Sequence, residues 1–123
     1  MNRILVIDDD DDFRKMLALT LTRAGYDVME APNGREGLKI YQSNRIDLVI
    51  TDIFMPEKEG IETIIELKEF DRDSKIIAVS GGRDHEFVDI LDFLEDFGVS
   101  KKFKKPFTTQ ELLTEIGVLL KTG

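Results

Sequence analysis

Short apolar runs alternate with longer amphipathic stretches along the chain. The continuous run Ile4–Ile7 is followed by aspartates and is typical of a strand that is buried on both faces. Apolar residues then recur at helical spacing from Phe13 to Ala24, and Gly25 follows them in the manner of a helix C-terminal cap. The same alternation continues along the rest of the chain. It predicts strands over 4–7, 27–31, 46–51 and 76–79 and a short strand around Phe103, with helices over 13–24, 34–41, 61–67, 87–97 and from 108 or 109 to 120.

This alternation of strands and helices indicates the fold class. Five strand–helix units in sequence predict a parallel sheet with helices on both faces, which is a doubly wound α/β fold. The chain of 123 residues has the length of one domain. We therefore expect residues 1–123 to form a single domain.

The composition excludes several kinds of function. No cysteine is present, which rules out disulfides and thiolate chemistry. Lys and Arg number 17 and Asp and Glu number 25, and the resulting net charge of −8 disfavours direct binding to nucleic acid or to an anionic membrane. No apolar run approaches the ~20 residues of a membrane span, and aspartates follow the first strand too soon for a signal peptide. We therefore expect a cytoplasmic protein.

Polar side chains stand where the predicted strands end. In an open parallel sheet, ligands bind outside the carboxyl ends of the strands, at the point where the winding reverses. The residues at these ends are Asp8 and Asp9, Asp52, Ser80 and Lys105. Each has an ordinary explanation by itself, because aspartates cap helices, Asp and Ser favour turns, and lysine usually lies on the surface. Their occurrence together at the strand ends favours a functional site.

These residue types suit phosphoryl transfer. Clustered carboxylates repel one another, and a hard divalent cation such as Mg²⁺ relieves that repulsion. A carboxylate such as that of Asp52 can also attack phosphorus and form an aspartyl phosphate. The transfer then needs alignment and neutralisation of charge, which Mg²⁺ and the Lys105 ammonium would supply, together with a hydrogen bond from Ser80.

Four segments of the chain resemble the receiver domain of bacterial two-component response regulators. They are Ile4–Asp9 (ILVIDD), Leu48–Pro56 (LVITDIFMP), Ile76–Gly81 (IIAVSG) and Lys105–Phe107 (KPF). The resemblance covers essentially the whole chain and points to a single-domain receiver of the chemotaxis type. It implies a flavodoxin-like fold, with a five-stranded parallel sheet in the order 2-1-3-4-5 flanked by five helices.

The resemblance also implies how the site would hold a metal ion. Asp52 would be the phosphoacceptor, and Mg²⁺ would be bound by Asp9, by Asp52 and by the main-chain carbonyl of Phe54. Asp8 would stand beside them in the acidic pocket and act on the cation through water.

The remaining implied roles concern the phosphoryl group and its source. Ser80 would be the switch hydroxyl and Lys105 would supply positive charge, with a cis peptide bond before Pro106. The donor would be a phosphohistidine on a sensor histidine kinase or a phosphotransfer protein. The chain would catalyse only its own phosphorylation and dephosphorylation, and it would be a monomer or a weak homodimer that switches the binding of a downstream partner.

The residues of the switch depart from the family pattern. Receivers usually carry an aromatic residue three positions before the lysine, where this chain has Lys102, and Phe103 should face the core instead. We therefore expect switching to rely on Ser80 and the Gly81-Gly82 pair, while Lys102 stays outside. The stretch that follows the fourth strand should contain either a lengthened loop over 81–86 or an extra half-turn of helix.

The basic cluster of Lys101, Lys102 and Lys104 is the candidate partner surface. Lysines on an edge strand often serve to block pairing with another strand. The functional alternative is that an acidic partner docks against them.

Two other functions remain open. An aspartyl-nucleophile phosphatase would carry a second Asp two residues after the nucleophile, where Phe54 stands. A pseudo-receiver would bind a partner without phosphorylation, and the complete set of strand-end residues argues against it.

Overall fold

A computed structural model describes residues 2–53, 60–81 and 94–121. Its sheet has five parallel strands in the order β2-β1-β3-β4-β5. The strands are β1 (Arg3–Ile7), β2 (Asp27–Ala31), β3 (Leu48–Asp52), β4 (Ile76–Ser80) and β5 (Lys101–Lys104). The doubly wound fold predicted from the sequence pattern and the strand order implied by the resemblance are both confirmed.

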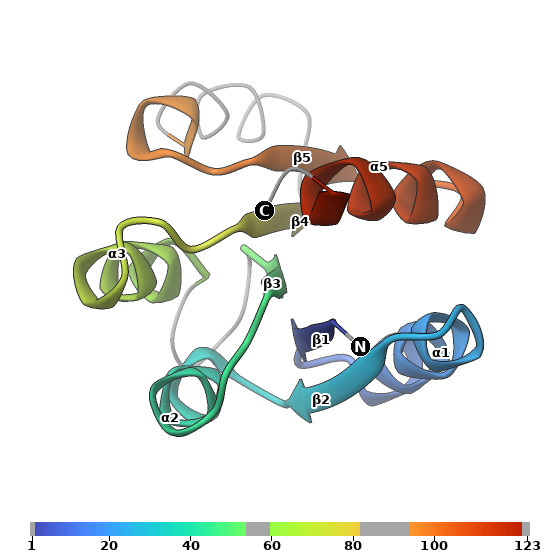
Figure 1. Ribbon diagram of the computed structural model, residues 1–123, viewed down its shortest axis with the longest axis horizontal. Coiled ribbons are helices and arrows are strands. Elements are labelled where there is room, and N and C mark those ends of the chain that lie inside the picture. The colour runs from blue at the N-terminus through green and yellow to red at the C-terminus, as the bar shows by residue number, and fades with distance from the viewer. Residues whose placement is uncertain (1, 54–59, 82–93, 122–123) are drawn as a thin grey trace.

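Helices cover both faces of this sheet. α1 (Asp11–Arg23) and α5 (Thr109–Lys121) lie on one face, and α2 (Gly34–Ser43) and α3 (Gly60–Phe70) lie on the other (Figure 1). Residues 94–97 are also helical and form the end of the helix predicted over 87–97, whose earlier residues lie outside the described part of the chain. Of the helices that the structure describes, none is long and apolar enough to cross a membrane.

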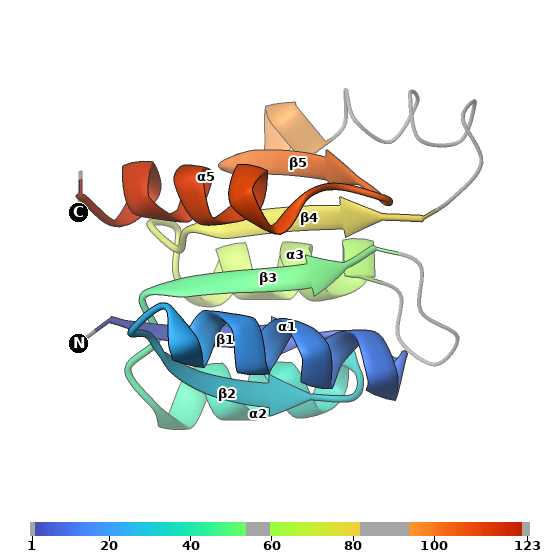
Figure 2. The same cartoon turned by 90° about the vertical axis from the view of Figure 1, so that its right-hand side faces the viewer.

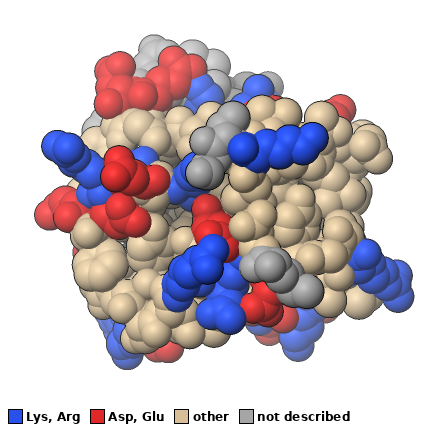
Figure 3. Space-filling model, in the orientation of Figure 1, with Lys and Arg blue, Asp and Glu red and all other residues tan. Residues whose placement is uncertain are grey.

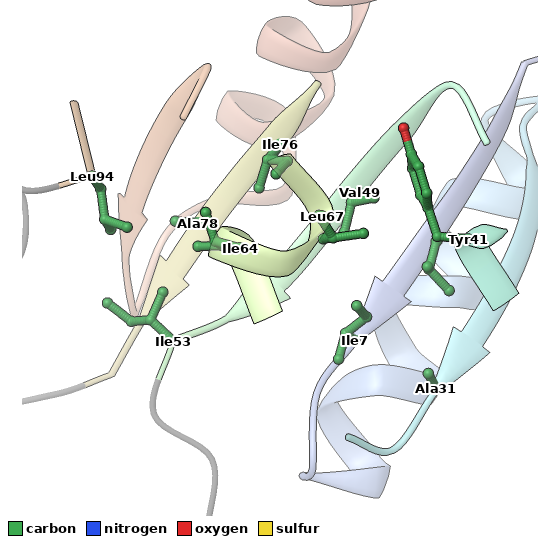
Figure 4. Packing of buried hydrophobic residues seen from close by; sticks show 11 residues of the cluster. Ile7, Ala31, Tyr41, Val49, Ile53, Ile64, Leu67, Ile76, Ala78 and Leu94 are labelled. Atoms are coloured by element: carbon green, nitrogen blue, oxygen red, sulfur yellow. The ribbon is translucent and has the colours of Figure 1, made fainter. Parts of the chain in front are cut away.

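Two apolar clusters hold the helices to the sheet, and alternate residues of β1 contribute to each. Ile4 and Val6 belong to the cluster that contains the buried leucines of α1 and the buried apolar residues of α5. Leu5 and Ile7 point the opposite way and belong to the cluster under α2 and α3, which Figure 4 shows. Burying one such aliphatic side chain stabilises a fold by about 1.5–3 kcal/mol. The strands between the two clusters therefore provide a rigid base for the residues at their ends.

Local sequence explains the boundaries of the first elements. The Asp10 carboxylate accepts a hydrogen bond from the Phe13 N–H (3.1 Å) and caps the first turn of α1. Gly25 follows α1 with a φ of +101°, the left-handed conformation expected of the predicted cap. β3 begins at Leu48, later than predicted, and Ile46 packs against the cluster under α2 and α3 without joining the strand ladder.

The amino end of the sheet carries charges of both signs. All strands point toward the right of Figure 2, and β1 begins and α5 ends at the opposite side. That amino end of the sheet carries lysines and arginines among aspartates and glutamates (Figure 3), and Arg3 Nε lies 2.7 Å from Asp27 Oδ2 there. The predicted site lies at the other, carboxyl end.

Candidate functional site

Neighbouring strands end together and bring the predicted residues to one place. β1 and β3 pair in register up to the residues that precede Asp8 and Asp52, so these two aspartates leave the sheet beside each other. Ser80 ends β4 and Lys105 follows β5, and the Lys105 main-chain N–H donates to the Ser80 carbonyl (2.7 Å). The polar strand ends predicted from the sequence thus share one edge of the sheet.

Three carboxylates converge at this edge. One oxygen each from Asp8, Asp9 and Asp52 lies within 4.8 Å of the others. Asp8 and Asp52 are only 2% and 8% exposed, whereas Asp9 is exposed to solvent. Mg²⁺ prefers oxygen ligands and is commonly held by one or two carboxylates. The donor set therefore fits the predicted binding of Mg²⁺.

Asp8 and Asp9 differ in what already surrounds them. Asp8 Oδ1 accepts a hydrogen bond from the Asp10 N–H (2.9 Å), and Asp8 Oδ2 lies 3.2 Å from Lys105 Nζ. Within the described ranges, no hydrogen bond or ion pair engages the Asp9 carboxylate. Asp9 is therefore better placed for a direct bond to a cation, in line with the roles that the resemblance implies.

The Lys105 ammonium lies between two of the carboxylates. Its Nζ is 3.2 Å from Asp8 Oδ2 and 3.4 Å from Asp52 Oδ2, in a side chain that is 23% exposed. The peptide bond between Lys105 and Pro106 is cis, as predicted. This ammonium offsets part of the repulsion among the carboxylates and stands where an added phosphoryl group on Asp52 would bring more negative charge.

Lys105 also contacts an aromatic ring, which belongs to a row of three. Its Nζ lies 4.0 Å from the ring centroid of Phe13, a cation–π contact. Phe13 meets Phe107 edge-on with centroids 6.2 Å apart, and Phe107 lies 5.3 Å from Phe103 of β5. The hydrophobic pattern predicted Phe13 only as a core residue of the first helix. Nothing in its spacing signalled a contact with a lysine so distant in sequence.

Arg14 is a second residue that sequence reasoning missed. It is 8% exposed, and its guanidinium contacts the Asp8 main-chain carbonyl, Asp11 and Glu30. Burial disfavours the charged guanidinium, but hydrogen bonds and charge interactions with Asp11 and Glu30 outweigh burial and raise the pKa of Arg14 above its ordinary value. Arg14 is therefore charged at neutral pH.

Some predicted features lie outside the described residues. These are the Phe54 carbonyl and the loop over 82–86. Ser80 itself is completely buried at the end of β4, next to Gly81. Ser80 therefore ends β4 at the same edge of the sheet as the three carboxylates.

The structure differs from the expectation that Lys102 stays outside and offers its charge to a partner. Its side chain is 18% exposed, and its ammonium forms an ion pair with Glu95 of the helical residues 94–97. This pairing lets the side chain leave solvent at a lower electrostatic cost. Phe103 lies on the other side of β5 and packs against the cluster of α1 and α5, as predicted. Of the three clustered lysines, Lys101 and Lys104 are exposed.

Comparison with known proteins identifies the family. The model of the response regulator receiver domain family matches residues 4–117. The chain belongs to this family. It is a receiver that accepts a phosphoryl group in two-component signal transduction, and the match does not favour a phosphatase or a pseudo-receiver.

Relatives of this receiver include single-domain proteins of the same length. The chain is 36% identical to the response regulator receiver protein CpdR of Brucella abortus, over 98% of both chains. A receiver domain protein from Clostridium thermocellum has a TM-score of 0.91 at 30% identity, with 99% of this chain and 96% of that chain covered. TrrA of Thermotoga maritima, solved in complex with Mg²⁺-BeF, has a TM-score of 0.86 at 36% identity, and the match covers 98% of this chain and 100% of that chain. The chain spans about half the length of other curated relatives, which are transcriptional regulators.

Proposed function

We propose that Asp52 accepts the phosphoryl group of this receiver from a phosphohistidine. The observation that carries the proposal is the position of Asp52, which ends the central strand β3 beside two other carboxylates and 3.4 Å from the Lys105 ammonium. An oxygen of Asp52 attacks phosphorus, the bond between phosphorus and the imidazole nitrogen breaks, and that nitrogen keeps the bonding electrons. The product is an aspartyl phosphate and a histidine ready for the next cycle.

The other residues of the site align the reactants and balance charge. Asp9, Asp52 and the main-chain carbonyl of Phe54 would hold Mg²⁺, with Asp8 acting through water. Bound Mg²⁺ would neutralise the carboxylates and the phosphoryl oxygens. Lys105 offsets the charge added to Asp52, and the Ser80 hydroxyl hydrogen-bonds to a phosphoryl oxygen and so reports phosphorylation to the end of β4.

The proposal extends to the setting in which this receiver works. Residues 1–123 form one receiver domain that acts in the cytoplasm, as a monomer or a weak homodimer. A sensor histidine kinase or a phosphotransfer protein supplies the phosphoryl group, and the chain catalyses only its own phosphorylation and dephosphorylation. The exposed Lys101 and Lys104 would meet an acidic downstream partner.

A mass measurement tests the proposed function. The protein is mixed with acetyl phosphate in Mg²⁺ or in a chelator, and its intact mass is recorded. The mass of one phosphoryl group should appear only with Mg²⁺, because the carboxylates otherwise repel the incoming group. Modification that is equal in the chelator, or none in either solution, would refute the proposal.

The two aspartates after β1 should differ in their effect on Mg²⁺ binding. Asp9→Asn should weaken Mg²⁺ binding more than Asp8→Asn does. For Asp8→Asn we expect Mg²⁺ affinity to fall about tenfold, which is typical of residues that contact a metal ion only through one of its ligands. Asp12→Asn removes an equal charge from an exposed position of the same acidic run and serves as the control. Titration calorimetry gives the three affinities. A larger loss in Asp8→Asn would exchange the two roles.

Loss of the Lys105 ammonium should separate metal binding from phosphorylation. Lys105→Met should slow phosphorylation by acetyl phosphate about 100-fold, the usual effect of removing one group that stabilises transition-state charge. Mg²⁺ should bind more tightly, because a neighbouring positive charge is gone. Lys104→Met, at the exposed preceding residue, should change neither quantity. A phosphorylation rate equal to that of the wild type would remove Lys105 from the mechanism.

A further inference from the structure

An arginine occupies the inward-facing stripe of α1 at the point nearest the site. The buried residues of this helix are Arg14, Leu17, Ala18 and Leu21, which recur at the spacing of one helical face. An apolar residue would suit that stripe, because a buried charge is costly unless it is paired. The arginine at the first of these positions therefore needs an explanation beyond packing.

The three nitrogens of the Arg14 guanidinium each have a partner from a different segment. Nη1 donates to the Asp8 main-chain carbonyl at 2.7 Å, in a buried hydrogen bond. Nη2 lies 2.7 Å from Asp11 Oδ1 in the first turn of α1, and Nε lies 3.2 Å from Glu30 Oε1 on β2. The planar guanidinium fork thus ties the end of β1 to the start of α1 and to β2.

The bond to the Asp8 carbonyl bears directly on Asp9. That carbonyl belongs to the peptide that joins Asp8 to Asp9, so fixing its oxygen fixes the plane from which the Asp9 side chain departs. On the other side of the turn, Asp8 Oδ1 accepts the Asp10 N–H, and Asp10 C=O accepts the Arg14 N–H (2.9 Å). The turn that presents Asp9 is therefore held from both sides.

We propose that Arg14 is a positioning residue for the divalent cation, which holds the peptide between Asp8 and Asp9 so that the Asp9 carboxylate meets the cation. The inference rests on the cation site of the proposed function. Asp11 and Glu30 together more than neutralise the guanidinium, so Arg14 holds the turn without repelling the cation. The residue acts through geometry, and its charge alone would weaken cation binding.

A matched arginine on the same pair of strands provides the control. Arg3 begins β1, and its Nε lies 2.7 Å from Asp27 Oδ2 at the start of β2, whereas Arg14 bonds to Glu30 near the end of β2. Arg3 therefore forms the same type of ion pair at the end of the sheet away from the site.

The experiment measures Mg²⁺ affinity by calorimetry, and the melting temperature without metal, in wild type, Arg14→Lys, Arg14→Gln and Arg3→Lys. Both Arg14 variants should bind Mg²⁺ about tenfold more weakly, as is typical when the partner of a ligand is lost, and Arg3→Lys should bind it like wild type. Arg14→Lys keeps the positive charge but loses the planar guanidinium, so it tests whether the geometry of the guanidinium holds the turn. Because the charge is kept, this variant is also the better able to fold.

Other outcomes separate the possible failures. If Arg14 acted only through its charge, Arg14→Gln would bind Mg²⁺ more tightly and Arg14→Lys would bind it normally, which would overturn the inference. A lower melting temperature with unchanged Mg²⁺ affinity in Arg14→Lys would reduce Arg14 to a structural role. Absence of Mg²⁺ binding by wild type would instead refute the cation site itself.

Discussion

The Asp52→Ala variant should gain no phosphoryl mass from acetyl phosphate and Mg²⁺, and it should be more stable than wild type without metal. Asp52 is 8% exposed and shares one ammonium, that of Lys105, with Asp8, while Asp9 stands nearby. The site therefore carries an excess of negative charge when no cation is bound, and removing one carboxylate relieves repulsion. We expect a gain on the order of 1 kcal/mol in the free energy of unfolding, measured with urea in a chelator.

An aspartate just before the same strand gives the comparison for Asp52. Asp47 Oδ2 accepts the Arg3 main-chain N–H (2.8 Å), and its Oδ1 lies 3.3 Å from Arg45 Nη2. Asp47→Ala removes these contacts and should lower the free energy of unfolding by about 1 kcal/mol. The variant should still be phosphorylated. If Asp52→Ala took up phosphoryl groups like wild type, the acceptor would be another residue. If it were less stable than wild type, repulsion would not dominate the metal-free site.

The Gly60→Ala variant should be strongly destabilised and should lose phosphorylation. Gly60 begins α3, and a Cβ there would lie 2.0 Å from the Asp52 carbonyl oxygen and 2.4 Å from Ile53 Cα. These are main-chain atoms, so relief requires a shift of the segment that carries the phosphoacceptor. Overpacking lowers the free energy of unfolding by about 1–3 kcal/mol or more. For a chain of this length, a loss of about 3 kcal/mol corresponds to a melting temperature lower by about 10 °C.

Two other glycines calibrate the effect of the added methyl group. Gly117 lies within α5 and a Cβ there meets nothing within 4 Å, so Gly117→Ala should stabilise the protein by up to about 1 kcal/mol. A Cβ at Gly37 of α2 would lie against the Ile7 side chain, which can move. The melting temperature of Gly37→Ala should therefore lie between those of Gly60→Ala and Gly117→Ala. Melting curves of the three variants give the order. Equal melting temperatures for Gly60→Ala and Gly117→Ala would show that α3 adapts without strain.

The residues at the strand ends were predictable from the sequence because the sheet is parallel. Once continuous apolar runs locate the strands, their carboxyl ends must share an edge, and the polar residues that follow them must meet. Asp8, Asp52, Ser80 and Lys105 illustrate this, since each directly ends or follows a strand. No knowledge of side-chain packing was needed to bring them together.

The contacts made by side chains on helices were not predictable in the same way. Helical periodicity identifies the buried face of α1 but does not say which end of that face lies near the site, so it predicts Phe13 only as a core residue and assigns no role to Arg14. The position of Lys102 depended on Glu95, which the chain brings beside β5 only through the packing of a preceding helix. Such pairs depend on tertiary distances that neither periodicity nor strand order contains.

Three aromatic rings lie in a row between Lys105 and β5, although position 102 carries no aromatic residue. Phe13, Phe107 and Phe103 touch in sequence, from the ammonium to β5. Phe103 also lines a groove with Lys101 and Thr114 between β5 and α5. If the ammonium moves toward a phosphoryl group on Asp52, the Phe13 ring loses the charge above its face, and each ring can shift against the next. Such a displacement would change the shape of the groove between β5 and α5.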